Sequence, residues 1–205
     1  MTPTFEIKVD QAKVDRVHFL LSDVKNGAQL ALMRSINNTL IGARTLTAKM
    51  IGQKATLKSA DIKARIFMLK ARMNWLNGRL SINGAPVFAT EYKHTIKKRG
   101  GISVKYYKDE KALQLRHGFP AEMNSGYEGI FLRDREKSST WPIGKTSKTG
   151  SRMRWRLPIN EIMGPSVMTL YENTPGISEA VETEASARLL REMESQVNYI
   201  LEKHK

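Results

Sequence analysis

A long apolar stripe with helical spacing constrains the fold of this chain more than any other feature. Between residues 28 and 51, apolar side chains recur every three or four positions, which predicts one long amphipathic helix. Gly52 follows directly, and glycine is typical of a helix C-terminal cap. A helix of this length with one apolar face packs along a sheet or a neighbouring subunit. The stripe consists of Leu32, Ile36, Leu40, Ala43, Leu46 and Met50, and the opposite side carries Arg34, Asn38 and Thr45.

Shorter helical patterns lie on either side of this stripe. Residues 10–24 predict an amphipathic helix with Asp10 as its N-cap, and Asn26-Gly27 interrupts it. Residues 59–64 predict a short third helix. The apolar face of the first helix consists of Val14, Val17, Leu21 and Val24.

A second long helix is predicted at the C-terminal end of the sequence. Thr174 is predicted as its N-cap and Pro175 as its first residue, because proline is favoured at that position. Three glutamates in the first turns suit the helix dipole. The apolar stripe has mostly four-residue spacing and consists of Ile177, Val181, Ala185, Leu189, Met193, Val197 and Ile200.

The sequence between these helices changes to strand-like alternation. Asn77-Gly78 and Asn83-Gly84 are turn signals, and residues 93–101 and 136–151 predict long basic loops. The predicted strands are Arg65–Ala71, Ile102–Lys108, Leu113–Arg116, Phe119–Met123, Gly129–Arg133 and Arg152–Ile159. We therefore expect an α+β fold with N-terminal helices, a central antiparallel β-sheet with long basic loops, and a C-terminal helix. The expected organisation is a single domain over 1–205, mainly helical in 1–64, basic and β-rich in 65–160, and helical again in 161–205.

Positive charge is concentrated in the middle of the chain. The net charge is +14, and residues 61–160 hold 21 Lys and Arg against 8 Asp and Glu. Residues 161–205 hold 4 against 8. Such an excess attracts nucleic acid, acidic protein surfaces or anionic lipid, and the alternative is a solvated basic face. The candidate contact residues are Lys97, Lys98, Arg99, Lys145, Lys148, Arg152, Arg154 and Arg156.

Three of these arginines form the most definite basic stripe. Arg152, Arg154 and Arg156 alternate with apolar residues, so a strand would place the three guanidinium groups on one face. Two interpretations have equal weight: contact with nucleic-acid phosphates, or pairing with acidic residues of a neighbouring subunit.

The sequence offers little for catalysis. It contains no cysteine, which excludes disulfides, thiolate catalysis and cysteine-ligated metals. Gly144-Lys145-Thr146 is similar to the end of a P-loop, but Ser139 stands where that motif requires glycine. We find no carboxylate cluster of the kind a metal-dependent nuclease needs. We therefore expect no enzyme, no metal and no cofactor. The sequence has no apolar run long enough for a membrane span, and its first residues lack the pattern of a signal peptide. We therefore expect a protein that works inside a cell or in a particle assembled there.

Two segments carry a specific pattern. Residues 119–133 read F-x-A-x-M-x-S-G-x-x-G-I-F-x-R, and residues 156–167 read R-L-P-I-x-x-I-x-G-P-S-V. The first predicts a tight hairpin, and the second predicts the end of a strand followed by a turn or short helix with Pro165 in its first turn. Met168 and Leu170 are then expected to pack beneath the sheet. The pattern residues expected to be structural are Phe119, Gly126, Gly129, Phe131, Arg133, Leu157, Pro158, Gly164, Pro165 and Ser166.

These segments resemble the prophage minor tail protein Z family. The resemblance implies a structural virion protein that completes the tail of a lambda-like phage, at the head-proximal end where the tail joins the head and receives the DNA end. It also implies assembly in the host cytoplasm and a homo-oligomeric ring, with a hexamer favoured. The implied partners are a tail terminator, tube or head–tail connector protein, with phage DNA in the lumen. The resemblance implies no catalytic residues. The alternative is a non-specific nucleic-acid-binding protein that acts through its basic middle segment.

Overall fold

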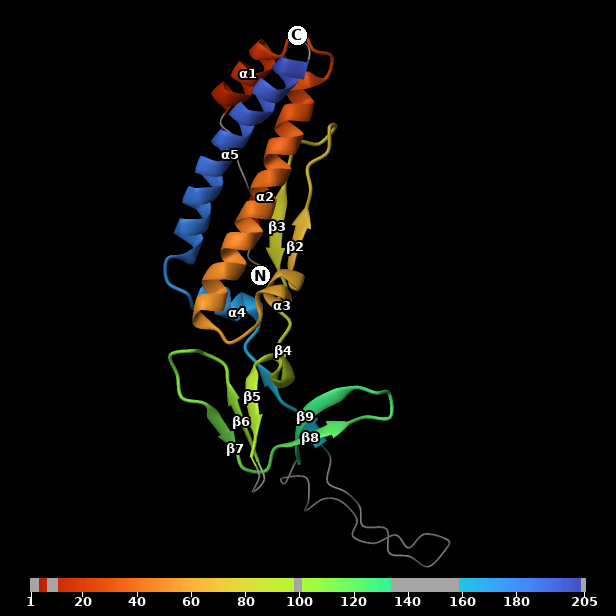
Figure 1. Cartoon of the computed structure of the whole chain (residues 1–205), viewed down its shortest axis with the longest axis vertical. Helices are drawn as coiled ribbons and strands as arrows, with labels where there is room; N and C mark the ends of the chain where they lie inside the picture. The colour runs from red at the N-terminus through yellow and green to blue at the C-terminus, as the bar shows by residue number, and fades with distance from the viewer. Residues whose placement is uncertain (1–3, 7–10, 98–100, 134–158, 204–205) are drawn as a thin grey trace, which may run out of the picture. The chain divides into compact units, whose positions relative to one another are not determined.

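The computed structural model describes residues 4–6, 11–97, 101–133 and 159–203 (Figure 1). These residues form an α+β fold of helices and small antiparallel sheets, which confirms the predicted fold class. The chain divides into two compact units. The first contains residues 1–85 and 166–205, and the second contains residues 86–165.

The first unit is built around the long helix α2. It combines both ends of the chain, because the helices α4 and α5 return to pack against the N-terminal helices. Its elements are α1 (Gln11–Leu20), α2 (Gly27–Lys54), α3 (Ser59–Ala64), α4 (Val167–Glu172), α5 (Ile177–Lys203), β1 (Thr4–Glu6), β2 (Ile66–Leu69) and β3 (Arg79–Ile82).

Helix α2 packs against α5 on one side and against the strands on another (Figure 1). On the α5 side, Asn38 Nδ2 donates to Glu192 Oε2 at 2.8 Å. On the strand side, the amide of Asn37 exchanges hydrogen bonds of 2.9 and 3.1 Å with the backbone of Ala71. Because α1, α3, α4, α5 and β3 all contact α2, its buried face is wider than the single predicted stripe. Leu46 and Met50 of that stripe are only half-buried, while the buried set extends to Thr47, Ala48 and Ile51.

Three hydroxyl residues are buried within this wide face. Ser35, Thr39 and Thr47 each donate to the carbonyl four residues earlier, at 2.8, 2.8 and 2.9 Å. An unpaired buried hydroxyl would be destabilising, and these bonds within the helix remove that penalty. Small polar side chains can therefore lie at the packed surface of α2.

Helix α5 buries the stripe that the sequence predicts. All seven stripe residues, from Ile177 to Ile200, are buried. Burial of an apolar side chain of this size contributes about 1.5–3 kcal/mol relative to exposure. The α2–α5 contact is therefore the main hydrophobic core of the first unit.

The sheet of the first unit has the strand order β1-β3-β2 and is antiparallel throughout. Leu80 and Ile82 of β3 and Ile66 of β2 are buried, whereas Phe67 and Leu69 are exposed. This alternation is the expected consequence of a sheet with one face on a core. The strand predicted at 65–71 is confirmed as β2. It lies in the first unit with the helices, whereas the other predicted strands that the structure describes lie in the second unit.

The second unit contains small antiparallel sheets. The three-stranded orders are β5-β6-β7 and β10-β9-β8, and β11 pairs with β4. The prediction of one central sheet is wrong in this respect, because the strands pair into separate small sheets. Most pairs join neighbours in the strand order, whereas β4 and β11 are far apart in sequence. The strands are β4 (Val87–Phe88), β5 (Lys93–Ile96), β6 (Ile102–Lys105), β7 (Leu113–Leu115), β8 (Phe119–Glu122), β9 (Glu128–Arg133), β10 (Ile159–Glu161) and β11 (Met163–Gly164), with a short 3₁₀ helix, η1, at Ala89–Glu91.

The predicted end of the first helix at residue 24 is wrong, because α1 ends at Leu20, and two further predicted helix ends are also wrong. Helix α2 continues through Gly52 to Lys54, and the backbone N–H of Ala55 bonds to Ile51. Helix α5 begins at Ile177, and Pro175 precedes it, because the hydroxyl of Thr174 donates to the carbonyl of Leu170 at the end of α4. Asp10 lies outside the described residues, whereas the short helix at 59–64 is confirmed. Among the described helices, none combines the length and apolarity needed to cross a membrane.

Candidate interaction surfaces

The two pattern segments come together in the second unit. Strands β8 and β9 form a hairpin in which Phe119 pairs with Phe131, and β10 pairs with β9 on the other side. The turn contains Gly126 with φ +78°, a conformation that favours glycine. Arg133 lies over the ring of Phe119, at 5.1 Å from its centroid. The predicted tight hairpin is confirmed, and these residues support one another.

Gly129 allows close packing inside this sheet. A Cβ there would lie 2.6 Å from the ring of Phe131 and 2.9 Å from Glu161 Oε1. Glu161 accepts a hydrogen bond from the hydroxyl of Tyr127. Burial raises the pKa of Tyr127 to about 12, and the hydrogen bond to Glu161 and the negative charges of Glu161 and Glu91 act in the same direction.

Gly164 has a similar role beside two tyrosines. A Cβ at this position would lie 2.5 Å from the ring of Tyr106 and 2.6 Å from that of Tyr92. The two rings meet edge to face with centroids 4.9 Å apart. The hydroxyl of Tyr92 donates to the carbonyl of Pro165 at 2.5 Å, and burial raises the pKa of Tyr106. The second pattern segment is therefore held by aromatic packing.

Ser166 begins the short helix α4. Its side chain accepts a hydrogen bond of 3.0 Å from the backbone N–H of Thr169, which makes Ser166 the N-cap. Pro165 precedes this cap, so the prediction that it lies in the first turn is wrong. Leu170 is buried, as expected, whereas Met168 is only half-buried, next to Gly84. Phe119, Gly129, Phe131, Arg133 and Gly164 therefore have packing roles, Gly126 has a backbone role and Ser166 a capping role.

Of the eight candidate basic residues, the structure describes Lys97. This residue is exposed after strand β5 and donates to the side chain of Gln114. The other seven candidates lie outside the described residues, as do Leu157 and Pro158 and the predicted arginine stripe. The candidates therefore stay predictions.

The described residues distribute charge differently from the linear segments. The described part of the second unit holds seven Lys and Arg against six Asp and Glu, so it is almost neutral. In the first unit, residues 11–85 hold 13 against 3, whereas α5 holds six glutamates against three basic residues. The first unit thus has a basic N-terminal part and an acidic last helix. The charge counts for residues 61–160 and 161–205 do not show this separation, because residues 61–85 belong to the first unit.

Exposed apolar side chains gather on and after strand β2. Phe67 is 56% exposed and Leu69 is 48% exposed, and both lie on the face of the sheet away from the core. Trp75, in the connection to β3, is 45% exposed. Lys70 and Arg72 follow Leu69 and are also exposed. We call Phe67, Leu69, Lys70, Arg72 and Trp75 the sheet surface.

Helix α5 presents a contrasting surface. Spacings of three and four residues place Glu179, Glu182, Ser186, Leu190 and Glu194 on one face, and all five are exposed. We call these residues the α5 surface. The ion pairs described for α5 involve other residues of the same helix: Arg191 with Glu184 at 2.7 Å and Arg188 with Glu192 at 3.7 Å.

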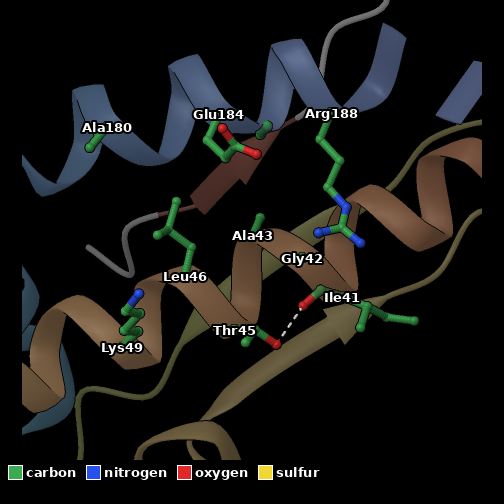
Figure 2. Close-up of a pocket in the computed structure, with 10 residues that line it drawn as sticks. Ile41, Gly42, Ala43, Thr45, Leu46, Lys49, Ala180, Glu184 and Arg188 are labelled. Atoms are coloured by element: carbon green, nitrogen blue, oxygen red, sulfur yellow. Dashed lines mark hydrogen bonds between the residues drawn. The ribbon is translucent and has the colours of Figure 1, made fainter. Parts of the chain in front are cut away.

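A groove of about 640 Å³ lies between α2 and α5 (Figure 2). Small residues of both helices line it, and Arg188 extends from α5 toward Gly42 of α2. A Cβ on Gly42 would lie 2.6 Å from the guanidinium carbon of Arg188. Arg188 Nε is buried without a hydrogen-bond partner among the described groups. Glycine at position 42 therefore lets the guanidinium lie against α2.

Comparison of the chain with protein-family models, curated proteins and solved structures gave no match.

Proposed function

We propose that this chain is a structural subunit of a tailed-phage virion, a tail-completion protein at the head-proximal end of the tail. The observation that carries the proposal is the first unit's surface, where exposed Phe67, Leu69 and Trp75 accompany strongly separated charges. Exposed apolar side chains that gather in this way are typical of protein–protein contacts. They support a subunit that works within an assembly.

The resemblance of residues 119–133 and 156–167 to the minor tail protein Z family specifies which assembly. Some described pattern residues pack against one another, as Phe119 does against Phe131 and Arg133, and Gly164 packs against Tyr92 and Tyr106 outside the pattern. Such roles suit a family whose shared residues maintain a fold. The proposed subunit joins a homo-oligomeric ring, favoured as a hexamer, and contacts tube, terminator or connector proteins.

The test is removal of this chain from the phage or prophage that encodes it. We expect filled heads and tails that do not join, visible by electron microscopy, and recovery when the chain is supplied from a plasmid. Normal tails that join heads in its absence would contradict the proposal.

Non-specific nucleic-acid binding is the second candidate function. It is favoured by the 13 basic against 3 acidic residues between positions 11 and 85. Phosphate contacts would make the affinity fall steeply with salt. Titration of the purified chain with DNA at several salt concentrations tests this candidate, and absence of binding at physiological salt would exclude it.

A further inference from the structure

The sheet surface has the composition of a docking site. Phe67 and Leu69 stand on the outer side of an edge strand, and in the described part of the chain no element covers them. An exposed edge strand with apolar side chains is prone to pair with another chain. Lys70 and Arg72 follow Leu69 in the chain and are exposed, so the connection that leaves β2 is positively charged.

The α5 surface is complementary in charge. Glu179, Glu182 and Glu194 lie on the same helix face as Leu190, which is 36% exposed. Lys13 and Arg16 of α1 line a groove that reaches Leu190 and Glu194, so the excess of negative charge is strongest at Glu179 and Glu182. Opposite charges around an apolar centre are characteristic of a specific interface.

One copy cannot bring these two surfaces together. Helix α2 lies between α5 and the strands (Figure 1). Asn38 donates to Glu192 of α5, and Asn37 donates to the carbonyl of Ala71 after β2. The two surfaces are therefore free to bind two different neighbours at the same time. A contact between unlike surfaces of identical chains repeats from copy to copy and closes into a ring when the rotation permits.

We infer that the sheet surface of one copy binds the α5 surface of the next copy. This inference rests on the proposed function and names the two surfaces by which the ring subunits join. Leu69 and Phe67 pack against the side of α5 around Leu190, and Lys70 and Arg72 face Glu179 and Glu182. Nucleic acid is the less favoured occupant of the sheet surface, because phosphates would leave Leu69 uncovered and the acidic surface unused.

Cysteine cross-linking tests the contact directly, since the chain contains no cysteine. Leu69→Cys and Ser186→Cys variants are prepared separately, mixed, and treated with a short bis-maleimide. We expect a product of twice the chain mass of 23.2 kDa from the mixture and not from either variant alone. The control pairs Leu69→Cys with Ser195→Cys, which lies on the same helix away from the α5 surface. Equal cross-linking with the control, cross-linking of Leu69→Cys with itself, or no product in the mixture overturns the inference.

Charge exchange provides a second test that depends on opposite charges. The Lys70→Glu/Arg72→Glu variant and the Glu179→Lys/Glu182→Lys variant should each lose self-association by about tenfold or more in sedimentation velocity, because like charges then meet. Mixing the two variants should restore it, since every contact then joins opposite charges. The matched control reverses Lys58 and Lys111, two exposed residues outside both surfaces, and should associate like the wild type. Failure of the mixture to recover overturns the inference, as does DNA binding that only the sheet-surface variant loses.

Failure of this inference and failure of the proposed function give different results. If the particles need the chain but each charge variant still complements the deletion, the proposed function stands and the contact is wrong. If the cross-link forms but particles without the chain are normal, the contact stands and the proposed function is wrong.

Discussion

At the scale of single residues, Gly164 is the clearest case of a residue chosen for space. The rings of Tyr92 and Tyr106 leave no room for a Cβ, and neither ring can turn away without breaking their edge-to-face contact. Overpacking of this kind costs about 1–3 kcal/mol. We predict that Gly164→Ala lowers the free energy of unfolding by that amount, measured by urea denaturation.

Gly84→Ala is the matched control for this prediction. Its Cβ would meet Met168 Sδ at 3.3 Å, at the end of a flexible side chain. Met168 can adjust, so we expect little change in stability. Similar losses of unfolding free energy in the two variants would show that the tyrosine pair does not require glycine at position 164.

Tyr127 gives a prediction about pH. Its pKa is raised from 10.0 to about 12, so the folded state favours the neutral phenol. The resulting stabilisation is fully present below pH 10 and is lost as the pH rises through 12. We predict that Glu161→Gln lowers the pKa of Tyr127, because it removes a negative charge and weakens the hydrogen bond.

The measurement is a pH titration of tyrosinate absorbance. The titration of Tyr127 is the difference between proteins with and without Tyr127→Phe, and it is obtained once with Glu161 and once with Gln at that position. The difference isolates Tyr127 from the other tyrosines of the chain. An unchanged pKa in Glu161→Gln would show that Glu161 does not act on this phenol.

At the scale of elements, α5 offers two adjacent leucines with opposite environments. Leu189 is 4% exposed and packs toward α2, whereas Leu190 is 36% exposed. We predict that Leu189→Ala costs about 2–5 kcal/mol of stability through the cavity it leaves. Leu190→Ala should cost below about 0.5 kcal/mol in the monomer. Urea denaturation at low protein concentration checks both, and equal losses would contradict the assigned buried face.

The same helix shows what sequence can predict. Its stripe from Ile177 to Ile200 follows from periodicity, because α2 is its main neighbour and covers one face. The start of α5 does not follow from the sequence. Thr174 and Pro175 have the residue types of an N-cap and a first helical residue, and only the bond from Thr174 to Leu170 shows that they precede the helix. Gly52 likewise resembles a cap, but tertiary packing around Ile51 and Ala55 extends α2 past it.

The candidate site was harder to predict than the fold. The pattern residues Gly129 and Gly164 were expected to be structural, and their packing explains why. The sheet surface was missed because exposed apolar residues such as Phe67 and Leu69 look like core residues in a strand pattern. Their position on an edge strand depends on pairing with β3, some twelve residues away, which local alternation does not specify.

At the scale of the whole molecule, each unit has a buried core of its own. Local unfolding commonly follows such units. We predict that Leu189→Ala lowers amide hydrogen-exchange protection in α2 and α5 and leaves β6 and β9 unchanged. Mass spectrometry of exchanged peptides checks this, with Leu190→Ala as the control. A uniform loss across both units would show that they unfold together.

The return of the chain to its first unit also sets an order of synthesis. Asn38 and Glu192 are 154 residues apart, so a ribosome adding about 5–20 residues per second separates them by roughly 8–30 s. During this interval the face of α2 that later meets α5 has no native partner, and all residues of the second unit are made. The unit that begins first is therefore completed last, and α2 waits on the ribosome for its main partner until α5 has been made.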